Sequence, residues 1–266
     1  VVVRSARGDV DRLQRLVVQV EDGPAALEID GLGGLKVGVA GALAQGRGCR
    51  RERWETPDGD FLDVDHLDAQ AGRPILLLVH GLEGSSRAQQ VRGFVQAAHR
   101  RGWRAVALNF RSCSGELNRL PRTYHGGDTM DLDWVIRRLI QRHPGDPIYA
   151  VGMSLGGNVL LKYLGESDDL PAALKAGAAI SAPCDLKASA LAFEEGFWNR
   201  VYMRRLIRSL KRETLAKRAR YPDLLDPQRL DAVRTIRDFD EAVTAPLNGF
   251  ASADAYWASS SCRRFL

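Results

Sequence analysis

A serine set between two glycines is the residue of this chain best suited to nucleophilic chemistry. Residues 148–157 read Ile-Tyr-Ala-Val-Gly-Met-Ser-Leu-Gly-Gly, an apolar run that leads into Gly-x-Ser-x-Gly. The pattern predicts a buried strand, a sharp turn at Ser154 and then a helix, which together carry the serine hydroxyl clear of the sheet. Gly152 and Gly156 allow the backbone to fold that tightly. Ser154 is therefore the candidate catalytic nucleophile.

The loop His80-Gly81-Leu82-Glu83-Gly84 is the second candidate feature, because it follows an apolar run that ends at Val79. In open α/β sheets, ligands bind at the carboxyl ends of the strands. Backbone N–H groups at such an edge can stabilise the negative oxygen that forms when a serine attacks an acyl group. We expect Leu155, which follows the serine, and Leu82 to supply the two N–H donors of an oxyanion hole.

The five histidines of the chain all precede Ser154. In proteins with this serine motif, the catalytic triad runs serine, acid, histidine along the chain. We therefore assign neither His80 nor His125 as the base, expect structural roles for both, and assign no triad acid. Arg111 follows a predicted strand, where an arginine either binds an anionic group or pairs with a neighbouring carboxylate. These three residues are the candidate pocket residues.

The elements that must position these residues alternate between strand and helix. Apolar runs over residues 74–79, 104–110, 147–151 and 176–182 predict buried strands, and amphipathic helical patterns lie between the runs. The alternation predicts an α/β fold with a mostly parallel sheet and helices on both faces. Asp58-Gly59, between two alternating stretches, predicts a β-hairpin with a primed turn. The core is expected to cover residues 51–266, and residues 1–50, with a helix-like pattern over residues 10–20, stay unassigned.

Residues 186–244 are charged, show helical patterns and have no strand pattern, so they are predicted to form a helical cap inserted after the sheet. Within the cap, Trp198, Tyr202, Leu206 and Leu210 follow i, i+4 spacing. This spacing predicts that these four side chains form a buried face, with the arginines on the opposite face.

Positive charge is concentrated in the same cap. Residues 199–220 hold nine basic residues and one acid, Glu213, a local charge of +8, so the rest of the chain carries −3 of the total of +5. The body of the protein is therefore not basic. No aromatic residues interleave the arginines on their face of the helix, as single-strand binders usually require. We predict no nucleic-acid partner.

The spacing of cysteines and glycines excludes the common cofactor sites. The four cysteines form no C-x-x-C pair, and residues 31–34 lack the third glycine of a dinucleotide loop. We predict no metal and no cofactor. The sequence shows neither an export signal nor a membrane span, so we predict a cytoplasmic protein and leave its oligomeric state open.

Several blocks of the chain resemble the YheT-type branch of the α/β-hydrolase superfamily, which is related to the abhydrolase-domain esterases and phospholipases. The matching blocks are Glu-Thr-Pro-Asp-Gly-Asp-Phe at 55–61, His-Gly-Leu-Glu-Gly-Ser-Ser at 80–86, Asn-Phe-Arg at 109–111, Tyr-His at 124–125 and Gly-Met-Ser-Leu-Gly-Gly-Asn at 152–158. The resemblance implies a serine hydrolase that cleaves esters of short or medium acyl chains through an acyl-serine intermediate. It also implies that the triad acid and histidine follow residue 266, so this chain is expected to be truncated and its activity impaired.

A binding protein is the alternative hypothesis. In this alternative, a non-catalytic hydrolase scaffold docks on an anionic lipid surface or on a protein. The contact would be made by Arg204, Arg205, Arg208 and Arg212, and it would weaken as salt screens their charges.

Overall fold

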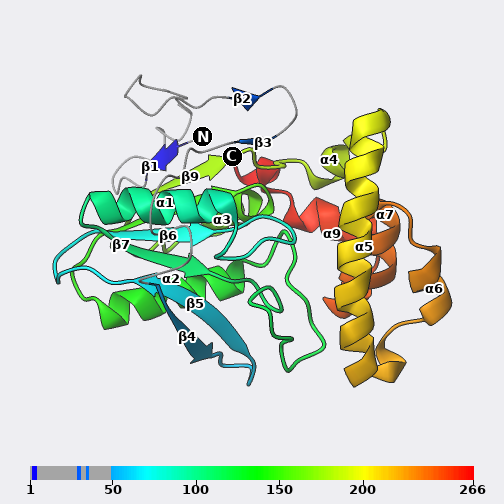
Figure 1. Ribbon diagram of the computed structural model, residues 1–266, viewed down its shortest axis with the longest axis horizontal. Coiled ribbons are helices and arrows are strands. Elements are labelled where there is room, and N and C mark those ends of the chain that lie inside the picture. The colour runs from blue at the N-terminus through cyan, green and yellow to red at the C-terminus, as the bar shows by residue number, and fades with distance from the viewer. Residues whose placement is uncertain (1, 5–28, 31–33, 36–48) are drawn as a thin grey trace.

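A seven-stranded sheet forms the centre of the protein (Figure 1). The computed structural model describes residues 2–4, 29–30, 34–35 and 49–266, so the helix-like pattern over residues 10–20 lies outside the described residues. The strands lie in the spatial order β1 (Val2–Arg4), β9 (Leu174–Ile180), β8 (Ile148–Met153), β6 (Ile75–Val79), β7 (Arg104–Leu108), β5 (Phe61–Leu67) and β4 (Arg50–Glu55).

The four strands at the centre, β9, β8, β6 and β7, are parallel to one another. They overlap the four apolar runs, and every residue of β7 is buried, but the prediction of a fully buried strand is wrong for β9, in which Lys175 and Ile180 are exposed. A strand that is covered on both faces has no polar side to expose, which explains why these runs are apolar without alternation. The predicted α/β fold with a mostly parallel sheet is confirmed.

Helices cover both faces of this sheet (Figure 1). Helix α1 (Gln89–Arg100) packs its Val91, Val95 and Ala98 on the face that carries Leu78. Helices α2 (Thr129–Arg142) and α3 (Leu155–Glu166) pack on the other face, against Leu77. The neighbouring residues Leu77 and Leu78 of β6 thus point to opposite faces of the sheet, because successive side chains of a strand alternate.

The edge strand β4 and its neighbour β5 form the predicted hairpin, but the predicted two-residue primed turn is wrong. The connection runs from Thr56 to Asp60: the Thr56 N–H donates to Asp60 O at 3.0 Å, and the Gly59 N–H donates to Thr56 O at 3.0 Å. A two-residue turn at Asp58-Gly59 would need Pro57 to donate a closing hydrogen bond, and proline has no N–H. Gly59 supplies the left-handed residue of the longer loop, with φ 82°.

The chain after the sheet is helical. Residues 181–266, all of them described, contain no strand. The helices are α4 (Leu186–Ala192), α5 (Phe197–Arg220), α6 (Pro227–Ala232), α7 (Ile236–Phe239), α8 (Ala245–Leu247) and α9 (Ala253–Ser260), joined by shorter helical turns. The long helix α5 stands across one end of the sheet (Figure 1). Among the helices of the described residues, none has the length and apolar composition needed to cross a bilayer.

The predicted buried face of α5 is wrong at its N-terminal end. Leu206 and Leu210 are buried as expected, but Trp198 is 72% exposed and Tyr202 55% exposed. Residues at i, i+4 spacing turn by about 40° per step around a helix of 3.6 residues per turn, so four of them spread over a third of the circumference. The buried stripe instead follows Met203, Leu206, Ile207 and Leu210.

Helix α3 begins in direct contact with the end of β6. A Cβ atom on Gly156 would lie 2.5 Å from the carbonyl oxygen of Val79 and closer still to that of His80. Both neighbours are backbone atoms, which cannot move without displacing the strand. Glycine at this position therefore sets how closely the helix approaches the sheet.

Replacing Gly156 with alanine should destabilise the protein by about 3 kcal/mol, the upper range for overpacking, even though alanine favours helices. Gly177→Ala is the matched control, because its Cβ would be crowded only by the flexible end of Leu164, at 2.5 Å, with Leu160 at an ordinary contact distance of 3.5 Å. Urea unfolding of both variants measures the difference. Equal free energies of unfolding for the two variants would contradict the close contact described for Gly156.

Candidate functional site

Ser154 occupies the turn between β8 and α3. Its φ of 51° lies in the left-handed region, a conformation that costs a serine of order 1–3 kcal/mol. The turn is held by its backbone: the Ser154 N–H donates to Ile180 O at 2.8 Å, and its carbonyl oxygen accepts from the N–H of Gly157 at 2.8 Å. The side chain is exposed. The hydroxyl is therefore accessible at the carboxyl edge of the sheet.

The glycines around Ser154 are required by close backbone contacts. A Cβ on Gly152 would lie 2.7 Å from Gly157 Cα, so the end of β8 and the first turn of α3 meet without side chains between them. A Cβ on Gly81 would lie 2.9 Å from Ser154 Cβ and 3.5 Å from Ser154 Oγ. The loop after β6 therefore lies directly beside the serine.

His80 fixes the shape of that loop. Its Nε2 accepts a hydrogen bond from the Phe110 N–H at 3.1 Å, so its Nδ1 carries the proton and donates to Gly81 O at 2.7 Å. The ring is buried, and burial lowers its pKa to about 4. His80 is thus neutral, with both ring nitrogens bound to backbone groups, and it links the loop after β6 to the loop after β7.

Two backbone N–H groups at this edge are unoccupied. Within the described residues, neither the Leu82 nor the Leu155 N–H donates a hydrogen bond to another protein group. Leu82 follows Gly81, and Leu155 follows Ser154 at the start of α3. Leu155 is therefore the serine's neighbour in the chain, and Leu82 adjoins Gly81, the loop residue that lies beside Ser154 in space. The N-terminus of α3 adds its partial positive charge.

Glu83, the next residue of the loop, is held by Tyr124. The Glu83 N–H donates to the Tyr124 oxygen at 2.9 Å, and the Tyr124 hydroxyl donates to Glu83 Oε1 at 3.3 Å. The Tyr124 ring stacks on Phe110 at 5.1 Å between centroids. These contacts keep Glu83 in its left-handed conformation, φ 56°, and connect it to the loop that His80 also binds.

The Glu83 carboxyl meets a second carboxyl from helix α5. Its Oε2 atom is buried and has no hydrogen-bond partner in the described part of the chain, and the Glu213 side chain lies beside it. Burial, together with the negative charge of Glu83, raises the pKa of Glu213 to about 7. When Glu213 is protonated, its carboxyl can donate to the Glu83 carboxylate and so join α5 to the loop beside Ser154.

Asn158 ties the loop that contains His125, and the end of α9, to the start of α3. The His125 Nδ1 accepts from the Gly127 N–H at 3.1 Å, and burial lowers the pKa of this histidine to about 3. The buried Asn158 side chain donates to Gly126 O at 2.7 Å and to Ser260 O at 2.8 Å. His125 therefore packs as a neutral residue, and Asn158 joins its loop to the end of α9.

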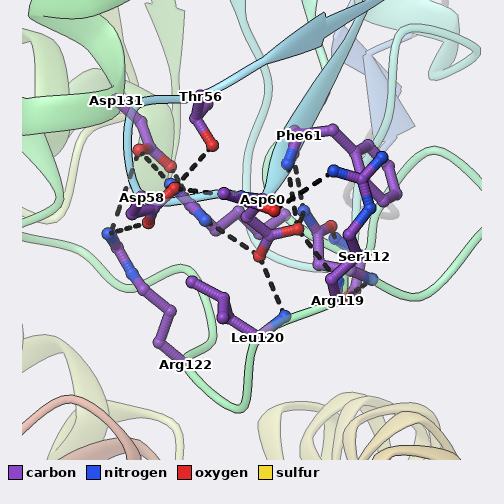
Figure 2. Close-up of polar contacts among 12 residues, drawn as sticks. Thr56, Asp58, Asp60, Phe61, Ser112, Arg119, Leu120, Arg122 and Asp131 are labelled. Atoms are coloured by element: carbon purple, nitrogen blue, oxygen red, sulfur yellow. Dashed lines mark hydrogen bonds and ion pairs between the residues drawn. The ribbon is translucent and has the colours of Figure 1, made fainter.

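Arg111 pairs with three carboxylates, those of Asp58, Asp60 and Asp131, which Figure 2 labels. Its guanidinium forms two hydrogen bonds to Asp131, both of 2.7 Å, and pairs with Asp60 at 2.9 Å and with Asp58 at 3.0 Å. The arginine side chain is 1% exposed, and the carboxylates raise its pKa further against the effect of burial. Of the two roles open to Arg111 from sequence, the structure gives it the carboxylate pairing.

The Arg111 cluster joins three segments. Asp58 and Asp60 belong to the hairpin loop, Asp131 to the first turn of α2, and Arg111 itself to the loop after β7. Asp60 also accepts hydrogen bonds from the backbone N–H groups of Arg119, at 2.9 Å, and Leu120, at 3.2 Å (Figure 2). The cluster therefore holds the edge hairpin against the body of the sheet.

Sequence reasoning did not assign contacts to Tyr124, Glu213 or Asn158. Tyr124 and Asn158 stand inside the blocks that carry the family resemblance, and Glu213 is the single acid among nine basic residues. An isolated acid in a basic helix was a usable signal, because nothing on its own segment requires it. Its partner Glu83, 130 positions earlier in the chain, was not accessible without the fold.

The chain matches a known family and several curated proteins. Residues 74–226 match the family described as alpha/beta hydrolase fold. The chain is 43% identical over 221 residues to YheT of Escherichia coli (strain K12), a match that covers 81% of this chain and 64% of that protein. It is 30% identical to the monoacylglycerol lipase of Saccharomyces cerevisiae, covering 80% and 47%, and 29% identical to the phospholipase ABHD3 of Mus musculus, covering 82% and 54%. The matches thus span between about half and two thirds of these relatives.

Replacing Arg111 with methionine should lower the free energy of unfolding by about 3–5 kcal/mol, since it leaves buried carboxylates without their cation. Arg137→Met is the control, because Arg137 pairs with Asp133 on the exposed surface of α2, where such a pair contributes at most about 1 kcal/mol. Urea unfolding at neutral pH measures both. A loss of the same small size in the two variants would show that the cluster does not stabilise the fold.

Replacing Glu213 with glutamine should change how stability depends on pH. The pKa of Glu213 is raised from 4.5 to about 7 in the folded state, so the stability that its protonated form contributes is present below pH 4.5 and is lost as the pH rises through about 7. Glutamine stays neutral, so Glu213→Gln should melt at the same temperature as the unsubstituted protein at pH 5 and at a higher temperature at pH 8.

Glu195→Gln, at an exposed position before α5, is the matched control and should show no such pH-dependent difference. Thermal melts followed by circular dichroism at the two pH values measure all three proteins. If Glu213→Gln and Glu195→Gln behave alike at pH 8, Glu213 does not share a proton with Glu83.

Proposed function

We propose that this chain, which belongs to the α/β-hydrolase family, acts on carboxylic esters of short or medium acyl chains with Ser154 as its nucleophile. The observation that carries the proposal is the placement of an exposed, left-handed serine beside two unoccupied backbone N–H groups, those of Leu82 and Leu155. This is the set of groups that acyl transfer needs: a nucleophile and donors for a developing negative oxygen. Relatives named as a lipase and as a phospholipase favour esters as the substrate class.

In the proposed reaction, Ser154 Oγ attacks the carbonyl carbon of the ester while its proton passes to a base. The carbonyl oxygen becomes an oxyanion that accepts hydrogen bonds from the Leu82 and Leu155 N–H groups. Collapse of this intermediate breaks the bond to the alcohol, which takes up a proton and leaves an acyl-Ser154. Water then attacks the acyl group, releases the carboxylic acid and restores the serine.

The base is the part of this chemistry that the described residues do not supply. Within the described part of the chain, no imidazole forms a hydrogen bond with Ser154, and His80 has both ring nitrogens bound to backbone groups. A positioned general base contributes typically about 10²–10⁴-fold to such a reaction. We therefore expect slow turnover by the 266-residue chain, and a marked acceleration when imidazole is added as an external base.

The experiment is acylation of the 266-residue chain by p-nitrophenyl butyrate, followed by mass spectrometry of its peptides. We expect a butyryl group on the peptide that contains Ser154, formed faster with added imidazole, and no such group in Ser154→Ala. Ser181→Ala is the matched control, because Ser181 is also exposed and left-handed, with φ 50°, at the end of the neighbouring strand β9. This control should acylate at the unsubstituted rate.

Two results would decide against the proposal. Equal acylation of Ser154→Ala and the unsubstituted chain would mean that Ser154 is not the nucleophile. The second result is fast ester turnover that is abolished by Ser154→Ala and unchanged by imidazole. It would support Ser154 as the nucleophile but overturn the expectation of a missing base.

A further inference from the structure

The solvent-facing start of helix α5 carries a group of large apolar side chains, here called the aromatic patch. It consists of Phe197, Trp198, Val201 and Tyr202, which are 66%, 72%, 42% and 55% exposed. The rings contact one another and their neighbours: Phe197 meets Trp198 edge-on at 5.3 Å between centroids, and Tyr202 stacks on Phe193 at 5.8 Å. Grouped apolar side chains of this kind on a surface mark a site of interaction rather than the scattered exposure of single residues.

Arginines continue the same surface along the helix. Val201, Arg205, Arg208 and Arg212 are spaced by four, three and four positions, which places them on one side of an α-helix. Arg204, Arg205, Arg208 and Arg212, here called the arginine row, are all exposed. Among the described residues, no salt bridge involves any member of the row. Their guanidinium groups are therefore exposed and, within the described residues, form no ion pair with a carboxylate.

The chemistry of this surface fits the boundary of a lipid bilayer. Tryptophan, tyrosine and phenylalanine are favoured at the membrane–water interface, because their rings are apolar and the first two also carry a polar group. Arginines next to them are attracted to anionic headgroups. A helix with apolar aromatic residues and several basic residues on its outer surface is typical of attachment in the plane of a membrane. Between Trp198 and Arg212 every charged residue of the helix is basic, which favours an anionic surface over a mixed protein surface.

We propose that the outer surface of α5 docks the protein on an anionic bilayer, with the aromatic patch at the lipid interface and the arginine row against the headgroup phosphates. The inner face of the same helix packs around Met203, Leu206 and Ile207, and Leu82 packs against that cluster. In a docked molecule, α5 would thus lie between the lipid and the loop beside Ser154. The inference goes beyond the proposed function and does not depend on it.

The experiment is flotation of the 266-residue chain with vesicles of phosphatidylcholine alone and of phosphatidylcholine mixed with phosphatidylglycerol. We expect binding to the anionic vesicles, much weaker binding to the neutral ones, and loss of binding as salt is raised. Each arginine near the surface should contribute about fivefold to the partition coefficient, so the triple variant Arg204→Gln, Arg205→Gln, Arg208→Gln should bind about a hundredfold more weakly. Ser154→Ala should bind like the unsubstituted chain, which separates this test from that of the ester chemistry.

The charge-matched control is the triple variant Arg87→Gln, Arg100→Gln, Arg101→Gln, which removes the same number of exposed arginines in and beside α1. It should bind the anionic vesicles with at most a small loss. Equal losses in the two triple variants would show that net charge alone drives binding, and would overturn the proposal.

The aromatic patch has its own test, based on quenching of tryptophan fluorescence by brominated lipid. We expect the unsubstituted chain to be quenched on anionic vesicles and Trp198→Phe to bind as well but lose most of the quenching. Phe197→Ser with Trp198→Ser should weaken binding about tenfold, since it removes two interfacial rings. Absence of quenching in the bound unsubstituted chain, or absence of vesicle binding altogether, would overturn the proposal and point to a protein partner for the patch.

Discussion

The close packing of α3 on the ends of β6 and β8 is the constraint on which the rest of the site depends. Gly156 brings the first turn of the helix against the carbonyl groups of Val79 and His80, and Gly152 lets the end of β8 meet that turn. With no side chains between these segments, Ser154 is forced into a left-handed conformation that exposes its hydroxyl. The cost of that conformation is met by the hydrogen bonds and packing of the surrounding sheet.

Loops around this turn are held mainly by neutral side chains that bind backbone groups. His80 joins the loops after β6 and β7, and Asn158 joins the His125 loop to the end of α9. Burial lowers the pKa of both His80 and His125 well below neutrality, so neither ring carries charge at physiological pH.

Local pattern was enough to predict the sheet and its helices, and it failed where distant residues decide the outcome. The four parallel strands and the helical segment after residue 186 follow from apolar runs and from periodicity, which are properties of neighbouring residues. The type of hairpin turn was predicted wrongly, although the sequence contained the reason against it. Pro57 has no N–H to donate the closing hydrogen bond of a two-residue turn. The role of Arg111 was undecided because its partners Asp58, Asp60 and Asp131 come from two other segments of the chain. The pairing of Glu83 with Glu213 was missed for the same reason.

Helix α5 illustrates how one element can satisfy two requirements with its two sides. Its inner side buries Met203, Leu206 and Leu210 and brings Glu213 to Glu83, so it covers the loop beside Ser154. A helix used only as a cover needs polar residues outside, and the arginine row would meet that need by itself. The need to cover the loop beside Ser154 does not explain the aromatic patch, because exposed rings lower solubility and contribute nothing to the contact beneath the helix. The rings gather at the end of the helix next to the unpaired arginines, so the outer side of α5 has the composition of a binding surface. The helix that covers the loop beside Ser154 can therefore also determine the surface to which the molecule attaches.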